Sequence, residues 1–367
     1  APSGLFNIDV IYGQTSTRSL STSPHYYGFG TVPGTNAPTS SPTSMPSVPT
    51  SLPSGQPSSY PTGVPSSQPT LPYKLMSSTS LQKGAPWPSF KRSALRHGTS
   101  PFYGPTASST SIKRTITISS SDSIKSSPAV GTNDIVYIGS DDNRLYAYDA
   151  SGTQLWSFNC FANVRSSPTI GQTSTVYVGA TTGLFAVNQN SGTEKWFVEI
   201  DGGAKGSPAL DVSENVYVGG ADGFLYKVSS SGTAVWTCTL GDSVGESSPV
   251  LSTTSDLVIV GANDGILYAA STTASSCSSF TWTYTTGGAI RSSPLIDDYG
   301  TVFVGSRDGY VHAVRENNGT LLWKTASNGN DDFDASPTID RHGLVVYIAD
   351  TGGILYAMRA RYHPGES

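Results

Sequence analysis

Nine consecutive prolines, from Pro38 to Pro69, are each followed by serine or threonine, mostly in steps of four residues. Such hydroxyl groups accept O-linked sugars, on Ser or Thr or on hydroxylated proline. Because proline fixes φ and disfavours helix in the residue before it, we predict an extended polyproline II arm that presents hydroxyls all round. The candidate O-glycosylation residues are Pro38, Thr39, Pro42, Thr43, Pro46, Ser47, Pro49, Thr50, Pro53, Ser54, Pro57, Ser58, Pro61, Thr62, Pro65, Ser66, Pro69 and Thr70.

A second site for sugar chemistry is the tripeptide Asn318-Gly319-Thr320, the single Asn-x-Ser/Thr acceptor in the sequence. It falls at a predicted turn between strands, where an attached glycan would point to solvent. We therefore predict N-glycosylation at Asn318, and covalent glycans as partners of the chain.

The three cysteines, Cys160, Cys238 and Cys277, are too few for a disulfide framework. We predict a pair between Cys238 and Cys277, which leaves Cys160 as a free thiol or as one end of an intermolecular bond. A chain that begins Ala1-Pro2-Ser3, without Met, is what cleavage of a signal peptide would leave. Both features favour a secreted, extracellular or cell-surface protein.

The remaining polar residues predict no catalytic, cofactor-binding or metal-binding site. Asp222, Asp264 and Asp308 each precede a glycine and are explained by tight turns. The acidic run 331–334 lacks the spacing of an EF-hand, so a solvated loop is favoured over calcium binding. The five histidines lack metal-ligand spacing, and no serine lies in a Gly-x-Ser-x-Gly elbow.

Composition excludes two further classes of partner. Only 13% of residues are charged, and the net charge is −5. Binding to nucleic acid would require a basic stripe, and the sequence has none. No apolar run approaches the roughly 20 residues of a membrane span.

The elements that carry these residues repeat with a period of about 40–45 residues from residue 115 onward. Each unit is predicted to hold four short strands separated by Gly-containing turns, with a Ser-Pro pair near its start and, in five units, a closing tryptophan. Such a sheet cannot bury both faces alone, so the units must stack radially, as in a β-propeller. We count six blades and leave seven or eight open. Ser-Pro recurs at Pro128, Pro168, Pro208, Pro249, Pro294 and Pro337.

The sixth unit ends without a tryptophan strand. Residues 113–118 precede the first Ser-Pro with the spacing that Lys195-Trp196 has before Pro208. We therefore predict that this N-terminal strand completes the last blade and closes the ring, which removes exposed sheet edges.

The fold class is thus all-β, with an extended arm before a propeller. The predicted parts are an N-terminal strand or assembly segment (1–32), the Pro/Ser/Thr-rich arm (33–75), a connector (76–112), the propeller (113–362) and a tail (363–367).

The glycine–tryptophan spacing in Gly152…Trp156, Gly192…Trp196, Gly232…Trp236 and Gly319…Trp323 resembles the tryptophan-docking motif of pyrroloquinoline-quinone-like propeller repeats. The Trp282 unit lacks the glycine and has a longer loop, 272–279. The resemblance implies that tryptophan packs between blades. The predicted blade-docking residues are Trp156, Trp196, Trp236, Trp282 and Trp323.

The resembled family includes quinone-dependent dehydrogenases, outer-membrane assembly scaffolds and secreted proteins. A dehydrogenase would need a catalytic Asp, calcium ligands and, typically, a vicinal Cys-Cys pair, and this sequence has no Cys-Cys. We therefore expect a non-enzymatic member without a cofactor. The Pro/Ser/Thr arm resembles the glycosylated stalks of algal and other protist surface proteins, including flagellar hair (mastigoneme) subunits. Together these favour a self-assembling structural subunit of a surface filament or wall, with a binding scaffold as the alternative.

Overall fold

The computed structural model describes residues 81–98, 115–118, 122–340 and 342–360, all of which belong to the structural unit Lys74–Ser367. The predicted N-terminal segment, the Pro/Ser/Thr arm and all candidate O-glycosylation residues lie outside the described residues.

The described chain forms six antiparallel sheets, numbered here in chain order. Sheet 1 contains β1 (Ala129–Val130), β2 (Val136–Gly139), β3 (Arg144–Tyr148) and β4 (Gln154–Asn159). Sheet 2 contains β5 (Thr169–Ile170), β6 (Thr175–Ala180), β7 (Gly183–Asn188) and β8 (Glu194–Glu199). Sheet 3 contains β9 (Ala209–Leu210), β10 (Val216–Gly219), β11 (Phe224–Val228) and β12 (Ala234–Thr239).

The second half follows the same order. Sheet 4 contains β13 (Val250–Leu251), β14 (Leu257–Gly261), β15 (Ile266–Ser271) and β16 (Trp282–Thr285). Sheet 5 contains β17 (Leu295–Ile296), β18 (Thr301–Gly305), β19 (Tyr310–Arg315) and β20 (Leu321–Ala326). Sheet 6 contains β21 (Thr338–Ile339), β22 (Val345–Ala349) and β23 (Leu355–Arg359). A short 3-10 turn, η1 (Thr132–Asp134), links β1 to β2.

Turn chemistry sets the hairpins within each sheet. In sheet 3, Gly223 has φ +84°, and the Asp222 carboxylate accepts a hydrogen bond from the Phe224 amide at 3.1 Å. A residue with a Cβ adopts that left-handed conformation only at a cost, which explains the recurrent Asp-Gly. The Asp side chain then satisfies a backbone N–H that the turn leaves unpaired.

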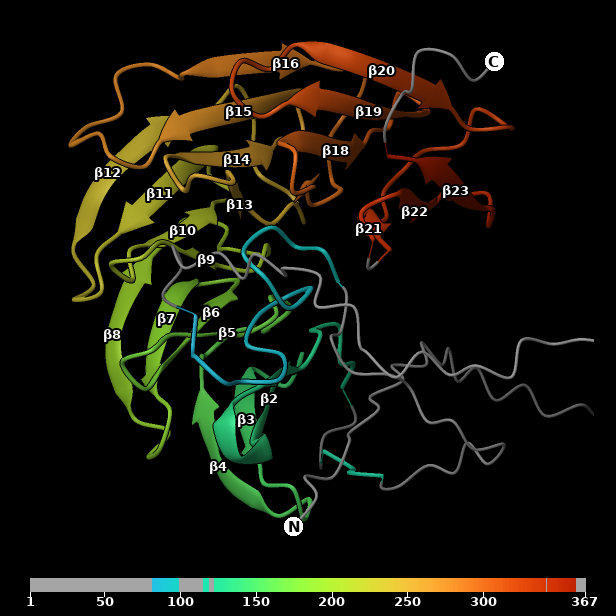
Figure 1. Ribbon diagram of the computed structural model, residues 1–367. Coiled ribbons are helices and arrows are strands. Elements are labelled where there is room, and N and C mark those ends of the chain that lie inside the picture. Colours follow the sequence, from blue (N-terminus) through green and yellow to red (C-terminus); the bar gives the residue numbers. More distant parts are fainter. Residues whose placement is uncertain (1–80, 99–114, 119–121, 341, 361–367) are drawn as a thin grey trace, which may run out of the picture. The chain divides into compact units, whose positions relative to one another are not determined.

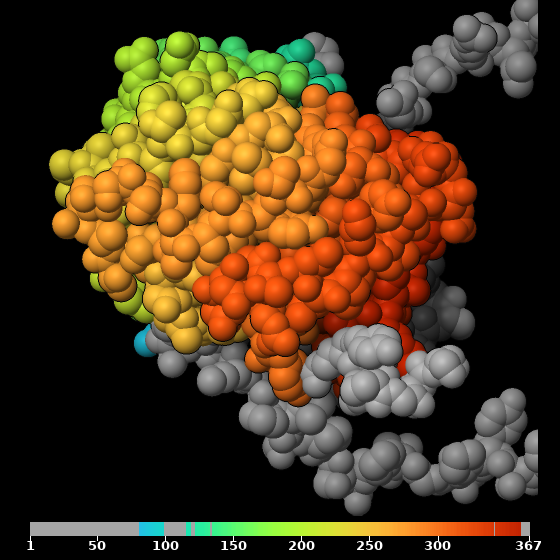
Figure 2. All heavy atoms as spheres, turned by 90° about the horizontal axis from the view of Figure 1, so that it is seen from above, coloured from blue at the N-terminus to red at the C-terminus, as the bar shows by residue number. Residues whose placement is uncertain are grey.

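Neighbouring sheets pack face to face through shared apolar clusters. One cluster joins Trp156 of sheet 1 to Phe185 of sheet 2, and others join sheets 2 and 3, 3 and 4, 4 and 5, and 5 and 6. The two-residue strands lie innermost and β4, β8, β12, β16 and β20 outermost (Figure 1). This radial stacking confirms the all-β propeller with six blades. Figure 2 shows the closely packed surface over the yellow and orange blades of the second half.

Sheet 6 differs from the prediction in its fourth strand. It has three strands in the described part of the chain, and Leu355 on the outer strand β23 is 70% exposed. Residues 115–118 are not in a strand, and residues 113 and 114 lie outside the described residues. Ile118 packs against Tyr146 and Tyr148 of sheet 1, which is the contact that Phe158 of the outermost strand β4 makes with Phe185 of sheet 2.

Candidate functional site

A chain of serine hydrogen bonds links the six blades close to their inner strands. The serine before each recurrent proline donates its amide N–H to the hydroxyl oxygen of the matching serine in the next blade. The bonds are Ser127 to Ser167 (2.9 Å), Ser167 to Ser207 (3.0 Å), Ser207 to Ser248 (2.8 Å), Ser248 to Ser293 (2.9 Å) and Ser293 to Ser336 (2.9 Å). The Ser-Pro repeat therefore sets the spacing between blades.

Residues 81–98, predicted only as part of a connector, cross the inner strands of the propeller (blue in Figure 1). We call them the axial segment. Trp87 exchanges two backbone hydrogen bonds with Val130 of β1, at 3.1 and 2.7 Å. In sheet 2, Ile170 donates to the carbonyl of Pro88 at 2.8 Å. The axial segment thereby acts as an extra partner for the shortest strands of sheets 1 and 2.

The far end of the axial segment reaches sheets 5 and 6. The Ile296 amide donates to the Leu95 carbonyl at 3.2 Å. The His97 carbonyl accepts from the hydroxyl of Thr338 in β21 at 2.7 Å. Lys91 donates to the carbonyl of Pro337, just before β21.

Arg96 connects the axial segment to sheets 3 and 4 through carbonyl groups that lie just before their inner strands. Its guanidinium donates to the carbonyl of Pro249 at 2.8 Å and to that of Ser207 at 3.0 Å, and it lies 5.4 Å from the ring centre of Phe90. The side chain is 2% exposed. Burial lowers the pKa of Arg96 to about 9. Burial, followed by the nearby charge of Arg96, also lowers the pKa of Lys91 well below its usual value.

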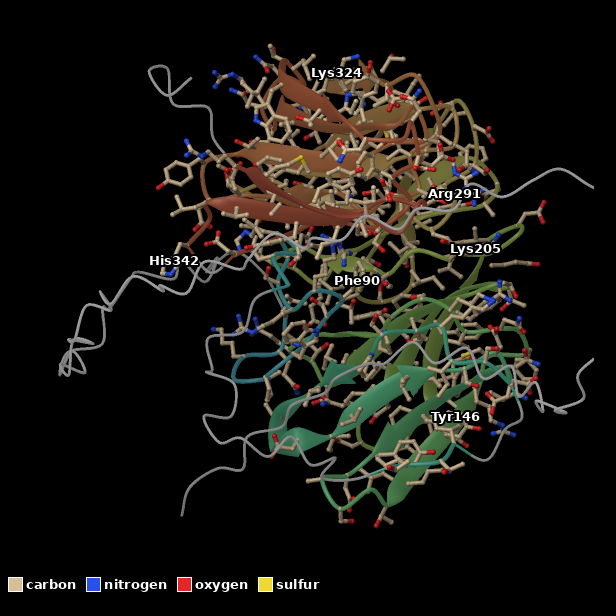
Figure 3. The ribbon with its side chains drawn as sticks, turned by 90° about the vertical axis from the view of Figure 1, so that its right-hand side faces the viewer. Phe90, Tyr146, Lys205, Arg291, Lys324 and His342 are labelled. Carbon is tan, nitrogen blue, oxygen red and sulfur yellow. A yellow bond between two sulfur atoms is a disulfide. The ribbon has the colours of Figure 1, made fainter. Side chains whose placement is uncertain are left out.

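The axial segment therefore contacts the inner part of all six blades within 18 residues. Figure 3 places Phe90 of this segment near the centre of the propeller. Lys205 and Arg291, which precede inner strands, lie on one rim, and His342 lies on the opposite side. Sequence reasoning missed the role of Arg96, because a single arginine outside the repeat carries no periodic signal.

The predicted docking tryptophans lie between blades. The indole N–H of Trp156 donates to the Gln189 carbonyl of sheet 2 at 3.0 Å, and that of Trp196 donates to the Ser230 carbonyl of sheet 3 at 2.9 Å. Trp282 does the same to the Glu316 carbonyl at 2.7 Å. Trp323 packs against Phe303 within its own sheet, with ring centroids 5.8 Å apart.

Trp236 is the exception, since its buried indole N–H has no hydrogen-bond partner in the described part of the chain. It faces sheet 4, whose turn is the longer loop 272–279 without the usual glycine. That loop carries Cys277, which forms a disulfide with Cys238, with Cα atoms 5.3 Å apart. The disulfide therefore joins sheets 3 and 4 at the interface where the docking tryptophan makes no hydrogen bond to the next blade.

Reduction of this disulfide is expected to lower the stability of the propeller. The bond closes a loop of 39 residues. On the chain-entropy estimate that loop is worth about 4 kcal/mol, an upper value. Thermal unfolding of the Cys238→Ser/Cys277→Ser variant should show a clear decrease in Tm, while Cys160→Ser provides the matched control without a disulfide. An unchanged Tm in the double variant would contradict this role.

Repeated aspartate–tyrosine pairs hold the turns of several blades. Tyr226 donates to Asp222 at 2.5 Å, and Tyr268 donates to Asp264 at 2.5 Å. His312 occupies the equivalent position in sheet 5, 3.1 Å from the Asp308 carboxylate. Burial lowers the pKa of His312, and the neighbouring Asp308 charge opposes this effect.

This histidine predicts a pH dependence of stability. Because its pKa in the folded state lies below that in the unfolded chain, the unfolded state binds the proton first as pH falls. Stability should therefore decrease as pH falls below about 6.5. Urea unfolding at pH 7.5 and 5.5 should show that the His312→Tyr variant loses less stability between these two pH values than the wild type does. The substitution introduces the tyrosine found at this position in other blades. An equal loss in both proteins would argue against His312 as the source.

The other predicted sites remain separate from one another. Asn318 is exposed at the β19–β20 turn, where its side chain accepts a hydrogen bond from the Thr320 amide at 3.0 Å. In the acidic run 331–334, Asp334 pairs with Arg307 at 2.6 Å. That ion pair accounts for Asp334 without calcium.

The described residues do not fit a quinone site with bound calcium. They contain no group of three or more His, Cys, Asp or Glu side chains that could hold a metal ion. The one disulfide joins cysteines of different blades, and Cys160 is free and buried. The described part of the chain also has no helix long and apolar enough to cross a bilayer.

Comparison with known proteins agrees with this architecture. The fold and the docking tryptophans define a PQQ-like β-propeller repeat domain. The family model described as outer membrane protein assembly factor BamB matches residues 103–280 and 221–362, and the chain belongs to this family.

Among solved structures, the crystal structure of the computationally designed Ika8 protein is similar, with a TM-score of 0.54 and 17% sequence identity. The match covers 65% of this chain and 71% of that chain, and at this identity it shows the fold alone. No curated protein matches the sequence.

Proposed function

We propose that this chain is a non-enzymatic extracellular structural protein, a glycosylated subunit of a surface filament or wall-type assembly. In this proposal the propeller is a rigid node, and the Pro/Ser/Thr-rich arm is the spacer that connects nodes. Copies of the same chain are the expected partners.

The observation that carries the proposal is the axial segment. It follows the arm in sequence and is bonded to inner elements of all six blades. A force applied to the arm would therefore be shared by the whole propeller rather than by one edge strand. An anchor of this kind suits a chain that transmits load, whereas a flexible tether would need no such contacts.

Two further observations support the proposal. The Cys238–Cys277 disulfide is typical of proteins that mature in an oxidising compartment. The arm offers nine Pro-Ser/Thr pairs, a composition typical of glycosylated stalks.

The proposal is tested on protein purified from its native source. Electron microscopy should show ordered filaments or sheets that contain propeller-sized nodes. Mass spectrometry of the peptide 33–72 should show masses of attached sugars. Monodisperse single propellers with a bare arm would contradict the proposal.

A binding scaffold is the second candidate, favoured by an open pocket between sheets 1 and 2. A pull-down that yields one stoichiometric foreign protein, without self-assembly, would favour this function over the structural one.

A further inference from the structure

The pocket between the first two blades has an apolar floor. It measures about 540 Å³ and is lined by residues of β7 and β8, of the β6–β7 turn and of the segments that follow β4 and β8. Its lining includes Cys160, Phe185 and Ile200, all of which are buried. Burial raises the pKa of the Cys160 thiol to about 12, so this thiol is neutral and acts as an apolar wall.

Aromatic rings form one wall of the pocket. Phe197 of β8 stacks on Phe185 of β7, with centroids 4.5 Å apart and ring planes at 30°. Phe158 of β4 meets Phe185 edge-on at 5.5 Å. Phe197 remains partly exposed, which leaves aromatic surface available to a ligand.

Phe161 stands at the mouth of the pocket and is 74% exposed. The other blades place small or polar residues at this position, and these are Asp201, Gly241, Gly287 and Asn328. Phe161 also has a φ of +60°, which is costly for a bulky residue. Blade packing does not explain a phenylalanine here, because its side chain packs into neither sheet.

Three exposed carboxylates, Glu194, Glu199 and Asp201, also line the pocket, and no Lys, Arg or His side chain is part of the lining. None of the three forms an ion pair within the described ranges. Lys195, their neighbour in sequence, donates its ammonium group to Thr173 and Thr175 instead. The pocket therefore combines three uncompensated negative charges with exposed aromatic surface.

The geometry points to a binding site for an organic cation, an ammonium or guanidinium group on an apolar stem such as a lysine or arginine side chain. The aromatic surface attracts cations through its negative faces, and the carboxylates supply the complementary charge. An anion would be repelled, and a neutral sugar would gain no Coulombic attraction from the three carboxylates. This site is independent of the proposed filament function.

The test uses the full chain and two fluorescein-labelled peptides, Gly-Gly-Arg-Gly-Gly and Gly-Gly-Glu-Gly-Gly, followed by fluorescence anisotropy. The arginine peptide should bind, the glutamate peptide should not, and binding should weaken as salt is raised. Displacement by free butylammonium would identify the alkylammonium group as sufficient. Binding that butylammonium does not displace would assign the site to a guanidinium-bearing side chain.

Variants locate the site. Glu199→Gln with Asp201→Asn should weaken binding of the arginine peptide by about tenfold or more. Phe161→Gly, which introduces the residue of sheets 3 and 4, should weaken it roughly three- to tenfold. Asp298→Asn, an exposed acid in the β17–β18 turn, should leave binding unchanged.

Thermal unfolding checks that each variant is folded. Wild-type affinity in the Glu199→Gln/Asp201→Asn variant would overturn the assignment. Equal binding of the glutamate peptide, or displacement of the arginine peptide by neutral maltotetraose, would also overturn it.

Discussion

The Gly192→Ala substitution is expected to destabilise the propeller by about 3 kcal/mol. A Cβ at this position would lie 2.6 Å from the indole ring of Trp156, too close for any real contact. Trp156 would have to move and lose its hydrogen bond to the Gln189 carbonyl. The φ of +68° adds a penalty of roughly 1 kcal/mol for a residue with a side chain.

Gly343→Ala provides the matched control. Gly343 has a φ of +67°, and a Cβ there would meet nothing within 4 Å. It therefore carries the backbone penalty alone, about 1 kcal/mol. Urea unfolding of the two variants separates tryptophan docking from backbone strain. Equal losses in both would show that Trp156 docking contributes nothing to the joint between blades.

The Arg96→Met substitution is expected to cost about 3 kcal/mol, because it leaves the buried carbonyls of Ser207 and Pro249 without a donor. Methionine restores much of the volume, so the loss reports mainly on hydrogen bonding. The methionine variant no longer carries the desolvation penalty of a buried guanidinium charge, and this gain offsets part of the cost. Here each guanidinium nitrogen donates to at least one carbonyl group, so we expect the loss of hydrogen bonds to dominate.

Lys205→Met is the control for Arg96→Met, since Lys205 is exposed on the rim and should change stability by less than about 0.5 kcal/mol. Trypsin gives a second readout, because loosening of the axial segment would expose Lys91 and Arg92 to cleavage. If Arg96→Met matched Lys205→Met in urea and in trypsin resistance, Arg96 would not be an anchor.

Periodicity made most of the fold predictable. The Ser-Pro pairs, the Asp-Gly turns and the tryptophans each recur in several units, so a local interpretation in one blade was checked by the others. The blade count followed from the same repetition. The repeat pattern also identified sheet 4 as irregular. Its missing glycine and longer loop 272–279 lie where the indole N–H of Trp236 has no hydrogen-bond partner.

Features that occur once were harder to predict. Arg96 lies outside the repeat, and nothing in its sequence context distinguishes it from a surface arginine. The strand predicted at 113–118 had the right spacing, and Ile118 makes the contact with the next blade that this position implies, but residues 115–118 are not in a strand. Phe161 did carry a signal, since it departs from small or polar residues at its repeat position.

We have proposed that the propeller is a node of a glycosylated assembly, anchored to its arm by the axial segment. Electron microscopy of native material, combined with mass spectrometry of the peptide 33–72, tests it most directly. We expect regularly spaced propeller nodes in ordered filaments or sheets, with sugars on that peptide. Single, unassembled propellers with an unmodified arm would contradict it.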